Sequence, residues 1–410
     1  MYNLHLSPEQ LEIRDTVRDF VTQEVKPVAL NPARLEPFEK PLLTELLGKA
    51  SQMGLRTLAL SEELGGAGAD RLTCCIVTEE LAVGDPDIAA VLAQTSSLAH
   101  MMFDRLMTKT QRDRFLPQFM KDDGFHLAFA EHEPGGETAL GIHYHRPAGT
   151  GSGIKATATR DGANWVINGV KDCVANATIA RLFAVQVRTP GGVSTLLAPG
   201  DAPGLTVRAH DGHWFHGAYG EVTFKDCRVP AENLLGTEGK SPLAGGLEAD
   251  GRGTPQFQAL NLGIGRAAYE AALDYGQLRV QGGRRIVEHQ AIGLKLADMA
   301  IKLDIARTAI WRAAWASDHP DAFADHSLPD LPLQTMAKVL ISEMMLNVAK
   351  EGAEFFGAMG VMRDMPLQKY VNDARVCLHS GNGNDDAKLK LAEILAGYRW
   401  PAAMPAVAAE

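Results

Sequence analysis

The chain has 410 residues, of which 46% are hydrophobic and 22% are charged. This composition is typical of a folded soluble protein, so a disordered chain, a collagen-like chain and a coiled-coil rod are excluded, and the length predicts two or three domains. Asp and Glu outnumber Lys and Arg by 50 to 40, a formal net charge of −10. Nucleic-acid binding needs a local excess of Lys and Arg, so the charge argues against that partner, but a few cations or helix N-termini can still hold a small anion.

The five cysteines are scattered along the chain, and no CxxC motif occurs. An odd number without regular spacing predicts neither a disulfide framework nor a zinc ribbon, and it favours a reducing, cytoplasmic location. The N-terminal residues lack the apolar run of a signal peptide. No apolar stretch reaches about 18 residues, so no membrane span is expected. We expect the Ala/Pro-rich residues 401–410 to form a flexible tail.

Residues 1–123 are predicted to form an N-terminal helical domain. Ser7, Pro8 and Gln10 have the order of an N-cap, a proline at the first helical position and a capping-box partner. Apolar residues recur at helical spacing behind this start and again within 41–53, 71–83 and 88–106. The glycine-rich residues 63–68 lack the order of a phosphate-binding loop, so we expect a turn between helices.

Residues 124–238 are predicted to form a central antiparallel β domain. Short runs rich in β-branched residues are separated by turn signals such as Asn168-Gly169. Many short strands with frequent turns indicate a compact β domain. The expected strands are 154–159, 165–168, 182–187, 194–198, 205–209 and 221–224.

Residues 239–400 return to a helical pattern and are predicted to form a C-terminal bundle. Periodic stretches of this length indicate long helices that pack on one another. The expected helices are 255–281, 289–317, 331–356 and 385–397, and residues 318–332 are expected to be a loop. The fold class is therefore mainly α with a central antiparallel β domain.

Several short motifs follow one another through these regions. They are His132-Glu133-Pro134-Gly135-Gly136, residues 171–176, Arg279 with Gln290, residues 356–360 and Asp373-Ala374-Arg375. In this order and spacing the chain resembles the acyl-CoA dehydrogenase family over nearly its whole length. The resemblance implies an N-terminal helical domain, a β-barrel-like middle domain and a C-terminal four-helix bundle, with FAD between the last two.

The family reaction implied is the α,β-dehydrogenation of an acyl-CoA thioester. A carboxylate removes the α proton, and flavin N5 accepts the β hydride. The resemblance also implies an electron-transfer flavoprotein as acceptor and a homotetramer or dimer, with a hetero-oligomer as an alternative.

Site residues come from the resemblance position by position. Those expected to contact FAD are Phe129, Glu131, His132, Thr138, Cys173, Val174, Ala175, Arg279, Gln290, Glu354, Gly357, Gly360 and Gly383. Those expected to contact substrate are Thr138, Arg252, Gly381 and Asn382. Arg279 matches the arginine of the FAD pyrophosphate, which a guanidinium can pair with bidentately.

Some of these positions depart from the family pattern. His132 replaces a threonine, and it either donates to a flavin carbonyl or only fills space. Cys173 and Ala175 replace a tryptophan that covers the flavin and a residue whose hydroxyl bonds near N5. No base is evident beside Cys173 in the sequence, so we expect a small buried hydrophobic residue rather than a nucleophile.

The catalytic base is the largest departure. The usual glutamate position is Gly381, and removal of a thioester α proton needs a base within hydrogen-bond reach. Asp250, with Glu248 beside it, is the candidate for a relocated base. Asp385 and Asp386 are expected to be first-turn acids of the last helix, where its dipole favours them.

Three interpretations remain open. The chain dehydrogenates an acyl-CoA with a relocated base, or it is a family member that performs another flavin reaction, redox-neutral or oxygenating. In the third interpretation it is a base-less subunit of a heteromeric enzyme. Glycines at 381 and 383 would leave room for a bulky acyl group. A metal site at His210, His213 and His216 is not expected, because their spacing fits a polar loop better.

Overall fold

The computed structural model describes residues 5–34, 41–134, 153–210, 215–243, 255–329, 331–379 and 383–396. Thr138, His213, Glu248, Asp250, Arg252, Gly381 and Asn382, all considered above, lie outside these residues. None of the helices in the described ranges is long and apolar enough to cross a membrane.

The N-terminal region is helical, as predicted. Its helices are α1 (Pro8–Phe20), α2 (Lys26–Ala29), α3 (Thr44–Gln52), α4 (Arg71–Gly84), α5 (Pro86–Ala99) and α6 (Lys109–Lys121), with π-helical segments η1 (Val21–Val25) and η5 (His100–Leu106). The predicted capping box is confirmed, because the Gln10 N–H donates to Ser7 Oγ at 3.2 Å and the Ser7 N–H donates to Gln10 Oε1 at 3.0 Å. Thr108 and Gln111 form a second box at α6, a helix that the sequence analysis missed.

Helix α5 lies between the other helices and the sheet. All of its residues are buried, and it packs against α4 and α7 on one side and against β1 on the other. Such a helix has no solvent face, which explains its small, apolar composition.

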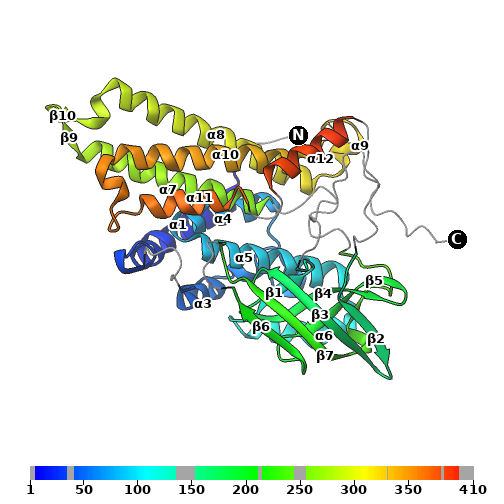
Figure 1. The fold of residues 1–410 in the computed structure, drawn as a ribbon. Helices are drawn as coiled ribbons and strands as arrows, with labels where there is room; N and C mark the ends of the chain where they lie inside the picture. The colour runs from blue at the N-terminus through cyan, green and yellow to red at the C-terminus, as the bar shows by residue number, and fades with distance from the viewer. Residues whose placement is uncertain are drawn as a thin grey trace.

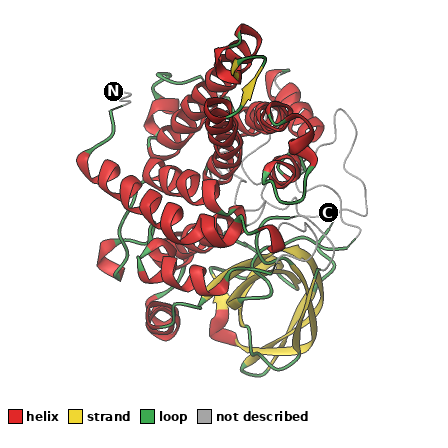
Figure 2. Ribbon diagram, turned by 90° about the vertical axis from the view of Figure 1, so that its left-hand side faces the viewer, coloured by secondary structure: helices red, strands yellow, loops and turns green. Residues whose placement is uncertain are grey.

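The central region forms one eight-stranded sheet that curls into a barrel-like shape (Figure 2). The strands are β1 (His126–Ala130), β2 (Thr157–Asp161), β3 (Asn164–Val174), β4 (Ala180–Thr189), β5 (Gly192–Pro199), β6 (Leu205–Ala209), β7 (Gly220–Pro230) and β8 (Leu234–Leu235). Their order is β6-β7-β3-β2-β4-β5-β8, and β1 pairs with β4.

The predicted central β domain is present, and two of its strand pairings depart from the predicted antiparallel direction. Strands β1 and β2 both pair with β4 in parallel, whereas the other pairings are antiparallel. Neither strand is joined to β4 by a tight turn. The longer connections between them allow the parallel direction, which a two-residue hairpin cannot provide.

The C-terminal region is a bundle of long helices. These are α7 (Gln256–Leu278), α8 (Gln290–Asp318), α10 (Leu333–Phe355), α11 (Leu367–Val376) and α12 (Asn384–Leu395). Residues 318–332, expected to be a loop, contain a short helix α9 (Asp321–Ala324). Asp385 and Asp386 lie in the first turn of α12, as predicted. At the end of the bundle remote from the β domain, β9 (Val280–Gln281) and β10 (Arg284–Arg285) form a hairpin (Figure 1).

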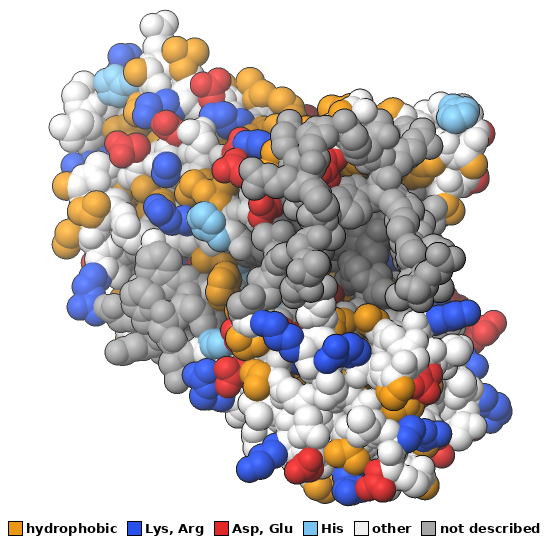
Figure 3. Space-filling view, turned by 45° about the vertical axis from the view of Figure 1, so that its right-hand side comes forward, with side chains coloured by type: hydrophobic (Ala, Val, Ile, Leu, Met, Phe, Trp, Pro, Cys, Tyr) orange, Lys and Arg blue, Asp and Glu red, His pale blue; other side chains and the backbone are white. Residues whose placement is uncertain are grey.

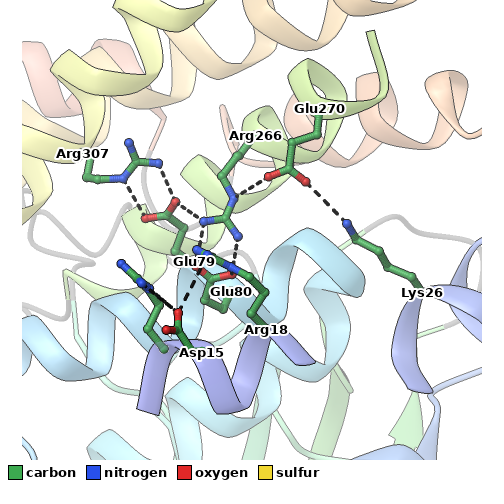
Figure 4. A network of polar contacts seen from close by, with 9 residues as sticks. Asp15, Arg18, Lys26, Glu79, Glu80, Arg266, Glu270 and Arg307 are labelled. Atoms are coloured by element: carbon green, nitrogen blue, oxygen red, sulfur yellow. Dashed lines mark hydrogen bonds and ion pairs between the residues drawn. The ribbon is translucent and has the colours of Figure 1, made fainter. Parts of the chain in front are cut away.

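A buried network of charged side chains joins the N-terminal helices to the bundle (Figure 4). Two adjacent glutamates of α4, Glu79 and Glu80, are 5% and 2% exposed. Arg266 of α7 contacts both, at 2.8 Å for Glu79, and Arg18 of α1 and Arg307 of α8 each contact one at 2.7 Å. Buried carboxylates need such partners, so the network fixes how α4 packs on α7.

Candidate active site

A buried lysine joins the chain after β1 to the end of β3. Lys171 has no solvent exposure, and its Nζ donates to Glu133 Oε1 at 2.7 Å and to the Glu131 carbonyl at 3.0 Å. The Asp172 N–H donates to the His132 carbonyl at 3.0 Å. Two motifs that are about 40 residues apart in the sequence therefore form one surface.

Glu133 is held in its charged form by this arrangement. It accepts the N–H groups of Lys155 at 2.7 Å and Ala156 at 3.0 Å as well as the Lys171 ammonium. Burial alone would raise the pKa of Glu133, but these donors outweigh it and hold the pKa below its usual value. Glu133 thus also fixes the chain that enters β2.

Backbone donors are available on the surface that Lys171 assembles. His132 and Ala175 lie outside the regular helices and strands. Within the described residues, their N–H groups donate to no backbone carbonyl. A flavin ring presents carbonyl oxygens and a ring nitrogen as acceptors, so these donors fit that group. The His132 pKa lies below its usual value because of partial burial and the nearby Lys171 ammonium, so its imidazole is neutral at physiological pH.

Cys173 does not match its predicted environment. It is exposed, whereas Cys74, Cys75, Cys227 and Cys377 are buried, and all five thiols are free. Its backbone φ of 50° is left-handed, which is rare for a residue with a Cβ. His210 and Asp172 lie beside it, with their ligand atoms within 4.8 Å of the thiol. The prediction that Cys173 is buried was therefore wrong, and the sequence analysis did not foresee that His210, which follows β6, lies beside it.

Just beyond Ala175, Asn176 connects the β domain to α5. Its Nδ2 donates to the carbonyls of Val91 and Leu127 and to Thr95 Oγ1, at 3.2–3.3 Å. Thr95 Oγ1 is also 3.1 Å from Nδ1 of His126, and burial lowers the pKa of that imidazole to about 4. These hydrogen bonds thus fix α5 against the sheet.

A narrow pocket lies between α4, α5 and the first turn of α7. It is mostly apolar and is lined by Leu55, Leu58, Cys74, Val77, Thr78, Leu81, Leu92, Ala93, Ser96 and Gln256. Gln256 is 2% exposed, and its Oε1 has no hydrogen-bond partner among the described residues. Burial raises the pKa of the Cys74 thiol to about 12, so that thiol is not a nucleophile at neutral pH.

The predicted FAD residues of the bundle lie in a second group. Arg279 follows α7 at the β9–β10 hairpin and is exposed, and Gln290 begins α8. Phe356, next to Gly357, stacks on Tyr275 at 4.1 Å between ring centroids, so Glu354, Gly357 and Gly360 share this end of the bundle. Figure 1 shows the β9–β10 hairpin at the end of the bundle away from β3, the strand that contains Cys173.

Gly383 lies apart from that group. It precedes α12, whose first residue, Asn384, contacts Lys338 and Ser342 in the first half of α10. A Cβ at Gly360 would lie 2.4 Å from the Ala353 carbonyl, so the close turn there requires glycine. At Gly383 a Cβ would meet only ordinary contacts.

Of the histidines considered for a metal, the two that the structure describes, His210 and His216, have different partners. His216 is buried against Asp87 of α5 and the Asp373 carbonyl of α11, whereas His210 contacts Asp172 at 2.7 Å. Sequence analysis missed both roles. The contacts of Lys171, His210 and His216 are long-range and leave no local pattern, although a lysine inside a strand is a signal for a buried ion pair.

The helical, β and helical regions in this order, with a backbone donor surface beside the sheet, define a flavin oxidoreductase of the acyl-CoA dehydrogenase type. Models of the N-terminal, middle and C-terminal domains of acyl-CoA dehydrogenases match residues 7–123, 148–227 and 254–392. The chain therefore belongs to the acyl-CoA dehydrogenase family, and the expected fold is confirmed.

Individual relatives match along almost their whole length. A probable acyl-CoA dehydrogenase of Bacillus subtilis, YngJ, is 30% identical over 395 residues, covering 94% of this chain and 97% of the relative. The mitochondrial short-chain specific acyl-CoA dehydrogenase of Rattus norvegicus is 29% identical, covering 94% and 90%.

Solved structures agree with this. Butyryl-CoA dehydrogenase from Megasphaera elsdenii superposes with a TM-score of 0.80 at 25% identity, covering 96% of this chain and 100% of that one. PigA, solved with FAD and proline, has a TM-score of 0.81 at 22% identity, covering 97% and 100%, which shows the shared fold.

Proposed function

We propose that the chain binds FAD and uses it to dehydrogenate an acyl-CoA thioester between its α and β carbons. The observation that carries this proposal is the surface that Lys171 assembles from the ends of β1 and β3. The flavin supplies the hydride acceptor, N5. The protein contributes alignment, fixed charges and exclusion of water.

On this proposal, the residues of the β domain hold the flavin ring. The N–H groups of His132 and Ala175 donate to its polar edge, and Phe129, Glu131, Cys173 and Val174 form the surrounding wall. The neutral His132 imidazole can donate a further hydrogen bond. Thr138, outside the described residues, is proposed to contact both flavin and substrate.

The proposed contacts with the substrate lie outside the residues that the structure describes. Arg252, Gly381 and Asn382 are the proposed contacts for the thioester ligand. Asp250 is the proposed base for the α proton. A carboxylate is required there because neither glycine nor serine can accept this proton unaided.

The position of Arg279 favours an oligomer. It lies in an exposed hairpin with Arg284 and Arg285, remote from the β domain of its own chain. We propose that it reaches the FAD pyrophosphate bound to a neighbouring subunit, together with Gln290, Glu354, Gly357 and Gly360. Gly383 is proposed to approach the flavin of its own chain.

Exposed apolar side chains support this assembly. Leu294, Ile301 and Ile305 are 70%, 55% and 48% exposed and lie on one face of α8, since they are seven and four residues apart. Met336 and Leu340 of α10 are also exposed. A soluble monomer rarely exposes such a stripe, so we propose a homo-oligomer, a dimer or a tetramer, that covers it.

The remaining proposals concern location and electron transfer. Five free thiols favour a reducing compartment, and we propose the cytoplasm. An electron-transfer flavoprotein is the proposed acceptor.

Acidic and basic side chains are interspersed over the β domain on the face in Figure 3, which does not have the continuous basic stripe of a nucleic-acid site.

The decisive experiment is anaerobic mixing of the purified protein with a panel of acyl-CoAs while flavin absorbance is followed. Bleaching by one class of acyl-CoA is expected, and Asp250→Asn should abolish it while FAD stays bound. Bound FAD that no acyl-CoA bleaches would contradict dehydrogenation, and a colourless protein that cannot be loaded with FAD would contradict the flavin site. A preference for short straight acyl chains would argue against the bulky acyl group expected from Gly381 and Gly383.

A further inference from the structure

We propose that Asp172, Cys173 and His210 bind a divalent metal ion of the zinc class at the end of β3 and β6. This site rests on the geometry of the three side chains. Because Cys173 is also proposed to border the flavin, the ion would lie beside the flavin site. No metal site was expected from the sequence, because the spacing of His210, His213 and His216 fits a polar loop better.

Strand pairing brings the three residues together. Gly220, the first residue of β7, pairs with Ala209 of β6 on one side and with Val174 of β3 on the other. Asp172 and Cys173 directly precede Val174, and His210 directly follows Ala209. The ends of β3 and β6 therefore lie at the same end of the barrel.

The close approach requires glycine in the strand between them. A Cβ at Gly220 would lie 2.8 Å from the Arg208 carbonyl and 3.2 Å from Ala177 Cβ. With no side chain there, the ends of β3 and β6 can approach each other across β7.

A β-bulge then turns two adjacent side chains toward one place. Lys171 pairs with Val222, but Val174 pairs with Gly220, so β3 has one residue more than β7 over this stretch. Side chains in a regular strand alternate between the two faces, and a bulge re-aims one of them. The left-handed backbone of Cys173 is part of this bulge. The Cys173 N–H donates to Asp172 Oδ1 at 2.8 Å, which holds the turned conformation.

The three donor atoms lie close enough together to share one metal ion after small movements of the side chains. His210 Nε2 and Asp172 Oδ1 are 2.7 Å apart, and the Cys173 thiol lies within 4.8 Å of both residues. Ligand atoms around a tetrahedral zinc ion are about 3.5 Å apart, which follows from bond lengths of roughly 2.0–2.3 Å. Small rotations of the side chains would therefore complete three ligands and leave the fourth position for water or another ligand.

The chemistry of the three donors selects the class of ion. One thiolate, one imidazole and one carboxylate are a typical set for zinc, whereas calcium and magnesium take oxygen ligands. On coordination the thiol loses its proton to solvent. Without an ion, burial and the Asp172 charge raise the pKa of Cys173, which disfavours an activated free thiolate.

An ion can reach this site from solvent. Cys173 is the exposed cysteine of the five. His210 and Asp172 are each about a quarter exposed at their side chains, 23% and 29%. A metal entering here needs no rearrangement of the core.

The test uses Zn²⁺ with the purified full-length protein, flavin as isolated, after removal of bound metal by a chelating resin. Zinc per chain is measured by elemental mass spectrometry after gel filtration. The alkylation rate of each cysteine by iodoacetamide is measured by peptide mass spectrometry. We expect about one zinc per chain and at least tenfold slower alkylation of Cys173 with Zn²⁺ present.

The variants Cys173→Ser and His210→Gln should each lose the bound zinc, and His210→Gln should also lose the protection of Cys173. His100→Gln is the matched control, because His100 pairs with Asp104 at 2.8 Å in the same way but belongs to no metal-ligand cluster among the described residues. Its zinc content should equal that of the wild type. The proposal is overturned if Zn²⁺ leaves the alkylation rate of wild-type Cys173 unchanged, a measurement that needs no variant. It is also overturned if Cys173→Ser retains one zinc.

Discussion

His216 Nδ1 lies 3.3 Å from Asp87 Oδ1, although 129 positions separate the two residues in the sequence. His216 Nε2 is 3.1 Å from the Asp373 carbonyl of α11. One imidazole from the segment before β7 is thus bonded to the N-terminal helices and to the C-terminal bundle. Both side chains of the His216–Asp87 pair are about 5% exposed, so solvent does not weaken it.

Because of the His216–Asp87 pair, we expect the protein to lose stability at alkaline pH. Burial lowers the pKa of His216, but hydrogen bonds to Asp87 and Cys377 and the Asp373 charge raise it overall, from 6.5 to about 10. The contribution of the His216–Asp87 pair to the free energy of unfolding is therefore complete below about pH 6.5 and is lost as the pH rises through about 10. His216→Gln should lower the free energy of unfolding by about 3–5 kcal/mol near neutral pH. Urea unfolding of the wild type and of His216→Gln should show that the difference between their free energies of unfolding shrinks as the pH rises from about 6.5 to about 10. A constant difference would contradict a charged His216.

His126 predicts the opposite dependence. The pKa of His126 in the folded protein is about 4, below the ordinary histidine value of 6.5, because the imidazole is buried in the network with Thr95. The unfolded chain binds this proton more readily, so the contribution is present above about pH 6.5 and is lost as the pH falls toward 4. Wild-type stability should decline in this interval. His126→Asn should be less stable at neutral pH but show a flatter decline, and an equal slope for both proteins would argue against a neutral His126.

The charge network around α4 predicts a large effect of Arg266. Arg266→Met leaves Glu79 and Glu80 buried with fewer counter-charges, which should lower the free energy of unfolding by about 3–5 kcal/mol. The control is Lys109→Met, because Lys109 pairs with Asp113 at the surface, where a pair contributes at most about 1 kcal/mol. Denaturant unfolding measures both. Similar small losses for the two variants would show that the network does not stabilise the packing of α4 on α7.

Lys171 predicts a link between stability and flavin retention. Lys171→Met leaves Glu133 without its ammonium partner and frees the segment of His132. The variant should therefore lose FAD on gel filtration, and its free energy of unfolding should fall by about 3–5 kcal/mol. The ratio of flavin to protein absorbance reports the first effect. Lys225→Met, at an exposed position of β7, should retain flavin as the wild type does. Full retention by Lys171→Met would exclude this surface as the flavin support.

Local signals were enough to predict much of the fold. The Ser7–Gln10 box, the helical period and the strand–turn alternation each depend on residues within a few positions of one another, and the structure has elements at these places. Helix α6 was missed although Thr108 and Gln111 carry the same signal as Ser7 and Gln10. The parallel pairing of β1 with β4 was also missed, because the direction of a strand depends on a long connection and not on its own sequence.

The candidate site was predictable only as far as the family pattern extends. That pattern placed the segments of His132 and Cys173 on one site, and the structure joins them through Lys171. It gave no sign that His210 lies beside Cys173, because this contact requires the bulge in β3 and the bare Gly220 in β7. The sequence showed that Cys173 replaces a family tryptophan. It did not show what surrounds Cys173, because those neighbours depend on the register of three strands, β3, β6 and β7.

The remote position of the β9–β10 hairpin has a consequence for inheritance and engineering. If each flavin pocket takes its halves from two polypeptides, a change in Arg279 and a change in Lys171 on the same molecule damage different pockets. Mixed assemblies of two singly altered chains would then regain some intact pockets, whereas a doubly altered chain mixed with itself would regain none.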